Sequence, residues 1–292
     1  TVTTEWTARL GGEAPTDGSD GLLEPSNPVG GGSLDDEDLT TSEEMNAAVA
    51  AFRAQVGAPP LTPDAALAKA AQAHASYVHA HDSDYAKGQI PGGSHSESKD
   101  FPDGFTGEEP WQRMVAAGYE GSPGFEVMAF SGVPDQALNL WIESVYHRIP
   151  FVSPDSVAFG YGRAPGVDVI DFGERSGDAG LVIVYPVAGQ VNVPTAWYGN
   201  ESPQPPAPEG GYPSGPVVTI TVAAASSLKL DTHRLVGPKG EVAHVWLARG
   251  SEQFLGATWS LYAEKPLQGG TEYTVEVSGQ SGSKGFEKSW SF

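Results

Sequence analysis

The chain has 292 residues, with 16 Lys and Arg against 37 Asp and Glu, which gives a net charge of −21. An acidic excess of this size argues against binding to nucleic acid and against docking on anionic lipid, because both need clustered basic side chains. The absence of cysteine excludes disulfides, thiolate zinc sites and cysteine nucleophiles, and no apolar run approaches the ~20 residues of a membrane span.

Residues 1–40 are predicted to form an acidic, extended N-terminal arm. They combine glycine- and proline-rich stretches with the acidic run Asp35-Asp36-Glu37-Asp38, and they lack any apolar period. The acidic run does not have the spacing or the turn glycine of a calcium-binding loop. We therefore expect a solvated segment there rather than a metal site.

Two amphipathic helices are predicted after the arm. A capping box begins at Thr41, and the apolar stripe that follows consists of Met45, Val49, Phe52 and Val56. The second helix is expected to have Thr62 as its N-cap and Pro63 at its first position. Its apolar face carries Leu67, Ala71, His74, Val78 and His81.

Two further helices precede a change to strand periodicity. A capping box at 106–109 predicts a helix that ends at Gly118, and Pro134 opens a helix whose faces run as far as His147. Short apolar runs then predict antiparallel strands at 157–163, 167–173 and 181–187. Helices followed by a meander indicate an α+β domain over residues 41–190, in which helices pack on a small sheet.

The last third of the chain has all-β patterns. Residues 191–216 are rich in proline and glycine and predict a semi-rigid, largely extended linker. Residues 217–292 contain six strand-like segments at the ~8–12-residue spacing of a β-sandwich. These segments are 217–223, 228–236, 241–248, 254–262, 271–278 and 286–292.

Histidines and glutamates gather between residues 74 and 147. They are His74, His79, His81, His95 and His147, with Glu97, Glu108, Glu109, Glu126 and Glu143. Imidazole and carboxylate together suit zinc, but no HExxH motif is present, so a site would have to form from separate loops and helices. For a lone histidine on an apolar helical face, a hydrogen-bonded core residue is the favoured interpretation.

Glu126 is the most informative of these acids. It lies in the apolar segment GFEVMAF, where an unpaired carboxylate would be costly to bury, so it should find either a histidine or a metal ion. The sequence has no GxSxG motif, no phosphate-binding loop and no GxGxxG motif. A serine–histidine dyad, from Ser94 with His95 or from Ser144 with His147, is a weaker alternative.

Five motifs follow one another in residues 42–187: FRAQVGAPPLTPDAALAKAAQAHASYV, GSHSE, RMVAAGYEGSPGFE, LWIESVYHRI and VAFGYG. Their order resembles the CAP superfamily (the cysteine-rich secretory proteins, antigen 5 and PR-1), and it looks most like the bacterial branch. The resemblance implies an α-β-α sandwich, export from the cell, and a central cleft of His and Glu residues that binds a divalent metal in some members. The matching cleft positions, and so the candidate metal ligands, are His95, Glu126 and His147.

The chain departs from the family pattern at several positions. Val127 follows Glu126 where the family often has Asn, the second cleft glutamate falls on Ser144, and the family's downstream histidine has no counterpart. Glu97 is a candidate replacement ligand, with a solvated loop acid as the alternative. In the C-terminal region, PLQGGTEYTVEVSG and SWSF resemble bacterial immunoglobulin-like modules.

Three functions are consistent with these patterns. The first is a secreted CAP-domain protein that binds a divalent metal such as zinc, or a small ligand, without turnover, at the cell surface or in an extracellular assembly. The second is a structural or adhesive component of a surface or filament, with a vestigial cleft and a protein partner. The third is a metal-dependent hydrolase with Glu126 or Glu97 as general base. We expect a binding protein rather than an enzyme.

Overall fold

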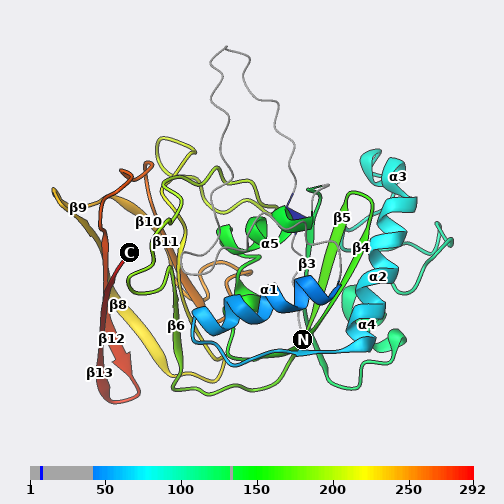
Figure 1. The fold of residues 1–292 in the computed structure, drawn as a ribbon, viewed down its shortest axis with the longest axis horizontal. Helices are drawn as coiled ribbons and strands as arrows, with labels where there is room; N and C mark the ends of the chain where they lie inside the picture. Colours follow the sequence, from blue (N-terminus) through cyan, green and yellow to red (C-terminus); the bar gives the residue numbers. More distant parts are fainter. Residues whose placement is uncertain (1–6, 9–41, 132–133) are drawn as a thin grey trace, which may run out of the picture.

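The computed structural model describes residues 7–8, 42–131 and 134–292 (Figure 1). The predicted arm, apart from Thr7 and Ala8, and the cap residue Thr41 lie outside these residues. The helices are α1 (Ser42–Gln55), α2 (Ala65–Ala80), α3 (Asp82–Ala86), α4 (Pro110–Ala117), α5 (Pro134–Glu143) and α6 (Ile149–Val152). The strands of the first sheet are β1 (Thr7–Ala8), β2 (Thr62–Pro63), β3 (Ser122–Ala129), β4 (Ser156–Ala164) and β5 (Val167–Glu174).

The start of α2 differs from the prediction. Thr62 and Pro63 do not begin the helix but form the short strand β2, which pairs with β4. Asp64 is the N-cap, and its carboxylate accepts the backbone N–H groups of Ala66 and Leu67 at 2.8 and 3.0 Å. The physical reason is that the carboxylate of Asp64 satisfies two of the unpaired donors at the helix start, while the two residues before it are used by the sheet.

The other helix starts are partly as predicted. The predicted stripe is confirmed, since Met45, Val49 and Phe52 are buried on α1 and Val56 is buried directly after its end. Helix α4 begins later than predicted, with Glu109 as N-cap and Gln112 completing the capping box. Thr106 does not cap this helix, because its backbone N–H and hydroxyl donate to the carboxylate of Glu97.

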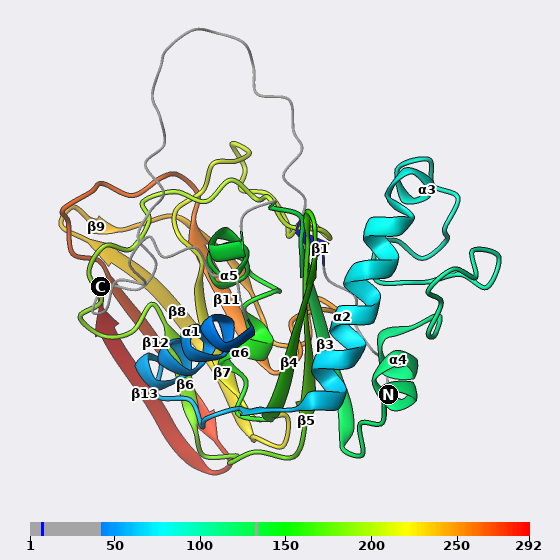
Figure 2. The same ribbon diagram turned by 45° about the vertical axis from the view of Figure 1, so that its right-hand side comes forward.

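Helices cover both faces of a mixed sheet (Figure 2). The strand order is β1-β3-β5-β4-β2, with an antiparallel centre and two-residue strands pairing in parallel at the edges. Helices α2 and α4 pack on one face, and α1, α5 and α6 pack on the other. This arrangement is consistent with the α-β-α layers that the resemblance implied.

Two glycines let α2 lie directly on the sheet. A Cβ added to Gly160 would lie 1.9 Å from the backbone nitrogen of Ala68, and one added to Gly162 would lie 2.0 Å from the backbone nitrogen of Gln72. Between them, Tyr161 points to the opposite face, because side chains alternate along a strand. The two glycines of the motif VAFGYG therefore leave no side chain at their positions on the face of β4 that meets α2.

The strand predicted at 181–187 is not part of this sheet. It is β6 (Val182–Tyr185), and it pairs antiparallel with β7 (Val218–Val222) of the C-terminal region. Ile183 and Tyr185 face the core beneath α1, whereas Val184 faces the core of the C-terminal sheets. A strand that is apolar on both faces fits between two cores rather than at the edge of one.

The C-terminal region consists of two antiparallel sheets that share one core. Their orders are β10-β11-β7-β6 and β13-β12-β8-β9. The remaining strands are β8 (Leu228–Gly237), β9 (Gly240–Glu241), β10 (His244–Leu247), β11 (Thr258–Ala263), β12 (Thr274–Ser281) and β13 (Lys284–Ser291). Each of the six predicted segments overlaps at least one strand of the two sheets, and the shared core makes a sandwich. Its likeness to immunoglobulin modules stays a prediction.

The segment predicted as a linker is packed against its surroundings. Trp197, Glu201 and Ser214 are buried, and a β-bridge joins Trp197 to Ser214. Trp197 belongs to a cluster with Val145 and Tyr146 from the end of the α5 region and with side chains of the sandwich. Residues 191–216 therefore fill the space between the two parts of the chain instead of spanning it as a spacer.

Candidate functional site

The loop after α3 and the strand β3 bring His95 and Glu126 together. His95 is 2 % exposed, and its Nδ1 lies 2.7 Å from Oε1 of Glu126, which is 1 % exposed. A carboxylate only accepts hydrogen bonds, so the proton lies on Nδ1 and the lone pair on Nε2. Nε2 is buried and has no hydrogen-bond partner among the described residues. The expectation that Glu126 finds a histidine is therefore confirmed.

Arg113 of α4 is the second partner of Glu126, and sequence reasoning missed it. Its Nη2 lies 2.7 Å from Oε2 of Glu126, and its side chain is almost completely buried. Burial alone would raise the pKa of Glu126, but the charge of Arg113, followed by His74 and His95, holds that pKa well below its usual range. Glu126 is thus an ionised, fully compensated carboxylate.

Asp171 faces Glu126 across the β3–β5 ladder. It is fully buried, and burial together with the adjacent charge of Glu126 raises the pKa of Asp171 well above its usual value. Two carboxyl groups side by side cannot both ionise in such surroundings. Burial and the neighbouring charge of Glu126 thus favour the uncharged form of Asp171.

His74 of α2 is the hydrogen-bonded core histidine that its place on the apolar face predicted. Its Nε2 donates to the carbonyl of Ser94 at 2.9 Å, and its Nδ1 lies 3.0 Å from Oε1 of Glu97. The other oxygen of Glu97 accepts the backbone N–H groups of Thr106 and Gly107 at 2.6 and 3.3 Å. Glu97 is buried, so it is not a solvated loop acid, and its oxygens are occupied.

The charges of this network balance. The carbonyl of Ser94 accepts from Nε2 of His74, and the carboxylate of Glu97 lies beside its Nδ1, so His74 and Glu97 form a buried pair. Arg113 pairs with Glu126 in the same way. Burial lowers the pKa of His95 to about 4, against the opposing effect of Glu126 and with smaller contributions from His74 and His147. His95 is therefore a neutral imidazole at physiological pH.

His147 lies in the turn between α5 and α6, not on a helix as predicted. Helix α5 ends at Glu143, and the next backbone N–H groups, of Val145 and Tyr146, donate to the carboxylate of Glu201 at 2.7 and 3.0 Å. The buried Nδ1 of His147 lies 3.0 Å from the same carboxylate. His147 is one of the groups whose electrostatic interaction lowers the pKa of His95.

The donor atoms fit a metal only in part. The oxygens of Glu126 bind His95 and Arg113, so Glu126 is placed to orient His95 rather than to coordinate an ion. A metal-binding histidine usually donates its other ring N–H to a carboxylate or a carbonyl, and His95 and His147 each lie against a carboxylate. Within the described ranges, no group of three or more His, Cys, Asp or Glu is arranged to hold a metal.

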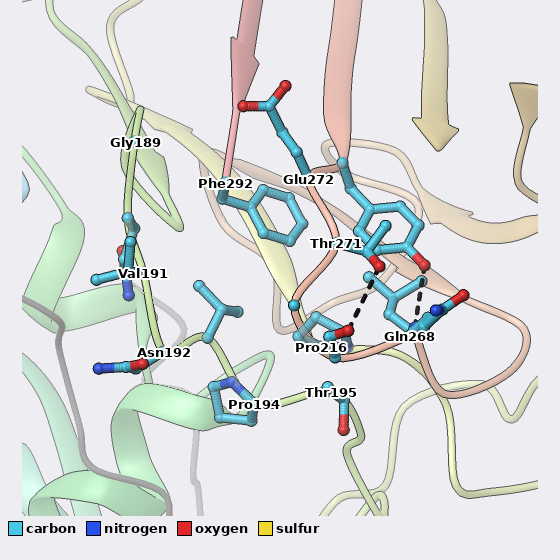
Figure 3. Close-up of a pocket in the computed structure, with 16 residues that line it drawn as sticks. Gly189, Val191, Asn192, Pro194, Thr195, Pro216, Gln268, Thr271, Glu272 and Phe292 are labelled. Carbon is cyan, nitrogen blue, oxygen red and sulfur yellow. Dashed lines mark hydrogen bonds between the residues drawn. The ribbon is translucent and has the colours of Figure 1, made fainter. Parts of the chain in front are cut away.

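A pocket lies away from this network, at one end of the sandwich (Figure 3). It has a volume of about 540 Å³ and is lined by residues 189–195 and 267–273, with Pro216 and Phe292. Its walls include the rings of Tyr273 and Phe292, and the hydroxyl of Tyr273 accepts the backbone N–H of Gln268 at 3.0 Å. None of the lining side chains belongs to the His/Glu network.

Comparison with known proteins supports the resemblance for the segment that holds most of this network. Residues 47–169 match the family model described as Cysteine-rich secretory protein family, CAP. The chain carries a CAP-like segment. No curated protein and no solved structure matches the chain. The CAP-like segment (residues 47–169) includes His95, Glu126 and His147, whereas Glu201 lies beyond it.

Proposed function

We propose that the chain is a secreted CAP-domain protein that binds a ligand without turnover, and that it holds a divalent metal such as zinc weakly through His95 and His147. The observation that carries the proposal is the buried Nε2 of His95, which has no hydrogen-bond partner among the described residues while its Nδ1 is fixed by Glu126. A pKa of about 4 keeps this imidazole neutral, and neutral imidazole is the form that binds metals. A bound zinc ion would supply a Lewis acid.

Binding is favoured over catalysis because neither candidate base is available. A general base works best when its pKa lies near the operating pH, whereas Arg113 and the histidines hold the pKa of Glu126 far below that range. The oxygens of Glu97 accept His74 and the start of the 106–107 loop. Ser144 donates its hydroxyl to the carbonyl of Trp141 at 2.8 Å, which does not support a dyad with His147.

The place of action is proposed from the family resemblance. Export, with action at a cell surface or in an extracellular assembly, is the setting that the CAP-like segment implies. Within the part of the chain that the structure describes, no helix has the length and apolar character needed to span the bilayer.

Calorimetric titration of the metal-free protein with zinc tests the proposal. We expect one weak site in the wild type, and loss of its heat in His95→Ala and in His147→Ala. The control is His233→Ala, whose imidazole lies on β8 against His244 and whose loss should leave the site intact. A wild type that binds no zinc, or a His95→Ala protein that binds it unchanged, would leave the structural or adhesive function as the better account.

A hydrolase is tested with the same preparation. We expect the protein to show no chelator-sensitive turnover of peptide, ester or glycan substrates. Turnover lost on chelation and in His95→Ala would overturn the non-catalytic proposal.

A further inference from the structure

The His147 turn is held by chain that lies outside the CAP-like segment. Glu201 belongs to residues 191–216, yet its side chain is completely buried where it meets His147. Its Oε1 accepts the N–H of Val145 at 2.7 Å, and its Oε2 accepts the N–H of Tyr146 and faces Nδ1 of His147, both at 3.0 Å. Three donors converge on one carboxylate, which is the coordination of an ionised acceptor.

The neighbouring Arg148 also contacts residues that follow the CAP-like segment. Its Nη1 donates to the carbonyl of Val217 at 2.9 Å and contacts the hydroxyl of Thr219 at 3.4 Å. Its guanidinium carbon lies 4.4 Å from the ring centroid of Tyr185 on β6. Both residues of the His147-Arg148 pair are therefore anchored by residues that follow the CAP-like segment.

A carboxylate lies behind each of the two imidazoles. Glu126 lies 2.7 Å from Nδ1 of His95. The carboxylate of Glu201 lies 3.0 Å from Nδ1 of His147. A carboxylate from a distant segment thus stands behind His147 as Glu126 stands behind His95.

We propose that Glu201 is the positioning residue of His147: it fixes the imidazole proton on Nδ1, directs the Nε2 lone pair into the site, and makes the site depend on chain beyond the CAP-like segment. The hydrogen bond between Glu201 and Nδ1 of His147 carries the assignment of the tautomer, and the effect of Glu201 on zinc affinity rests on the proposed function. Histidine that lacks such a partner is not held in one tautomer, because the hydrogen bond at one ring nitrogen decides which nitrogen is protonated.

Nitrogen NMR of the full-length protein with labelled histidine tests this proposal directly. In the wild type, His147 should show a protonated Nδ1 and an unprotonated Nε2, with the resonance assigned by its loss in His147→Gln. In Glu201→Ala the Nδ1–H signature should be lost, and in Glu209→Ala, an exposed glutamate of the same segment, it should persist. A wild-type His147 protonated on Nε2, or an unchanged Nδ1–H in Glu201→Ala, would overturn the proposal.

A second variant covers the case in which Glu201→Ala does not fold. Glu201→Gln keeps the size of the side chain and removes its charge, so the charge-assisted hydrogen bond weakens and the Nδ1–H proton resonance of His147 should move upfield. An unmoved resonance would contradict the assignment.

Zinc titration separates this inference from the proposed function. If the wild type binds zinc, its affinity should fall about 10–100-fold in Glu201→Ala and remain unchanged in Glu209→Ala. If the wild type binds no zinc, the proposed function fails, and the tautomer of His147 still decides the role of Glu201.

Discussion

At the scale of single residues, the site is a set of matched charges rather than an open acidic cleft. Glu126 lies beside Arg113, His95 and Asp171, a carboxyl whose pKa is raised, and Glu97 lies beside His74 and backbone donors. Each carboxylate is compensated in the interior, where an unpaired charge is expensive. The neutral imidazole of His95 keeps a buried Nε2 that has no hydrogen-bond partner among the described residues.

Removal of the Arg113 guanidinium should show how far the stability of the protein depends on compensation of the buried charge of Glu126. Arg113→Met leaves the buried charge of Glu126 without its strongest partner, so we expect unfolding free energy to fall by about 3–5 kcal/mol, measured by urea denaturation. Arg175→Met, at an exposed arginine, should change it little. The double variant with Glu126→Gln should recover part of the loss, and no recovery would show that the charge of Glu126 is not the cause.

His95 should give the protein a measurable pH dependence. Its folded pKa of about 4 lies below the ordinary value of 6.5, so the unfolded chain binds a proton first as the pH falls. The contribution of His95 to the free energy of unfolding is fully present above about pH 6.5 and is lost as the pH falls toward 4. Between pH 7 and pH 5 the loss amounts to about 2 kcal/mol.

His95→Asn should remove that part of the pH dependence, since the amide can still donate to Glu126 and does not titrate. Urea denaturation at pH 7 and pH 5 measures it, with the exposed His79→Asn as control. Equal pH dependence in wild type and His95→Asn would contradict the depressed pKa of His95.

At the scale of elements, the contact of α2 with β4 decides how His74 reaches the site. The backbone of the helix lies on the strand because Gly160 and Gly162 have no side chain. His74 is on the face of α2 that this contact buries, and it is 0 % exposed. Gly160 and Gly162, on one face of β4, therefore set how closely α2 approaches the sheet, and with it the position of His74.

Gly162→Ala should test this contact. The new methyl group would overlap the backbone of α2, so we expect a loss of at least about 1–3 kcal/mol in stability, measured by thermal or urea unfolding. Gly285→Ala is the matched control, because this glycine is also in a strand and its added Cβ meets nothing within 4 Å. Equal effects of the two substitutions would mean that α2 does not lie where the structure places it.

At the scale of the whole molecule, the layers continue from one part of the chain into the other. In Figure 2 the order runs from α2 through the first sheet to α1, α5 and α6, and then to the two sandwich sheets. Strand β6 lies in the fourth of these layers, with Ile183 facing the helices and Val184 facing the sandwich. The two cores therefore share one strand and are expected to lose their structure together.

Scanning calorimetry should show one unfolding transition for the full chain, with equal calorimetric and van't Hoff enthalpies. Ile183→Ala should lower the temperature of that transition without splitting it, because the side chain supports a strand that both cores use. Two resolved transitions in the wild type would show instead that the parts unfold independently.

Local pattern alone predicted the elements whose causes are local. The stripe of α1, the strands at 157–163 and 167–173, the six sandwich strands and the pairing of Glu126 with a histidine all follow from periodicity and from the cost of an isolated buried acid. The predicted start of α2 and the predicted end of α5 were wrong because residues distant in sequence act at both places. Strand β4 pairs with Thr62 and Pro63 before α2, and Glu201 accepts the N–H of Val145 after α5.

The sequence by itself determined the fold class, the amphipathic elements and the composition of the site, because those depend on neighbours a few positions apart. Only the tertiary structure decided that β6 leaves the first sheet, that residues 191–216 are packed, and which cations neutralise which carboxylates. Arg113 meets Glu126, and Glu201 meets His147, through the packing of layers. Such contacts depend on how elements stack in space, and that information is spread over the whole chain.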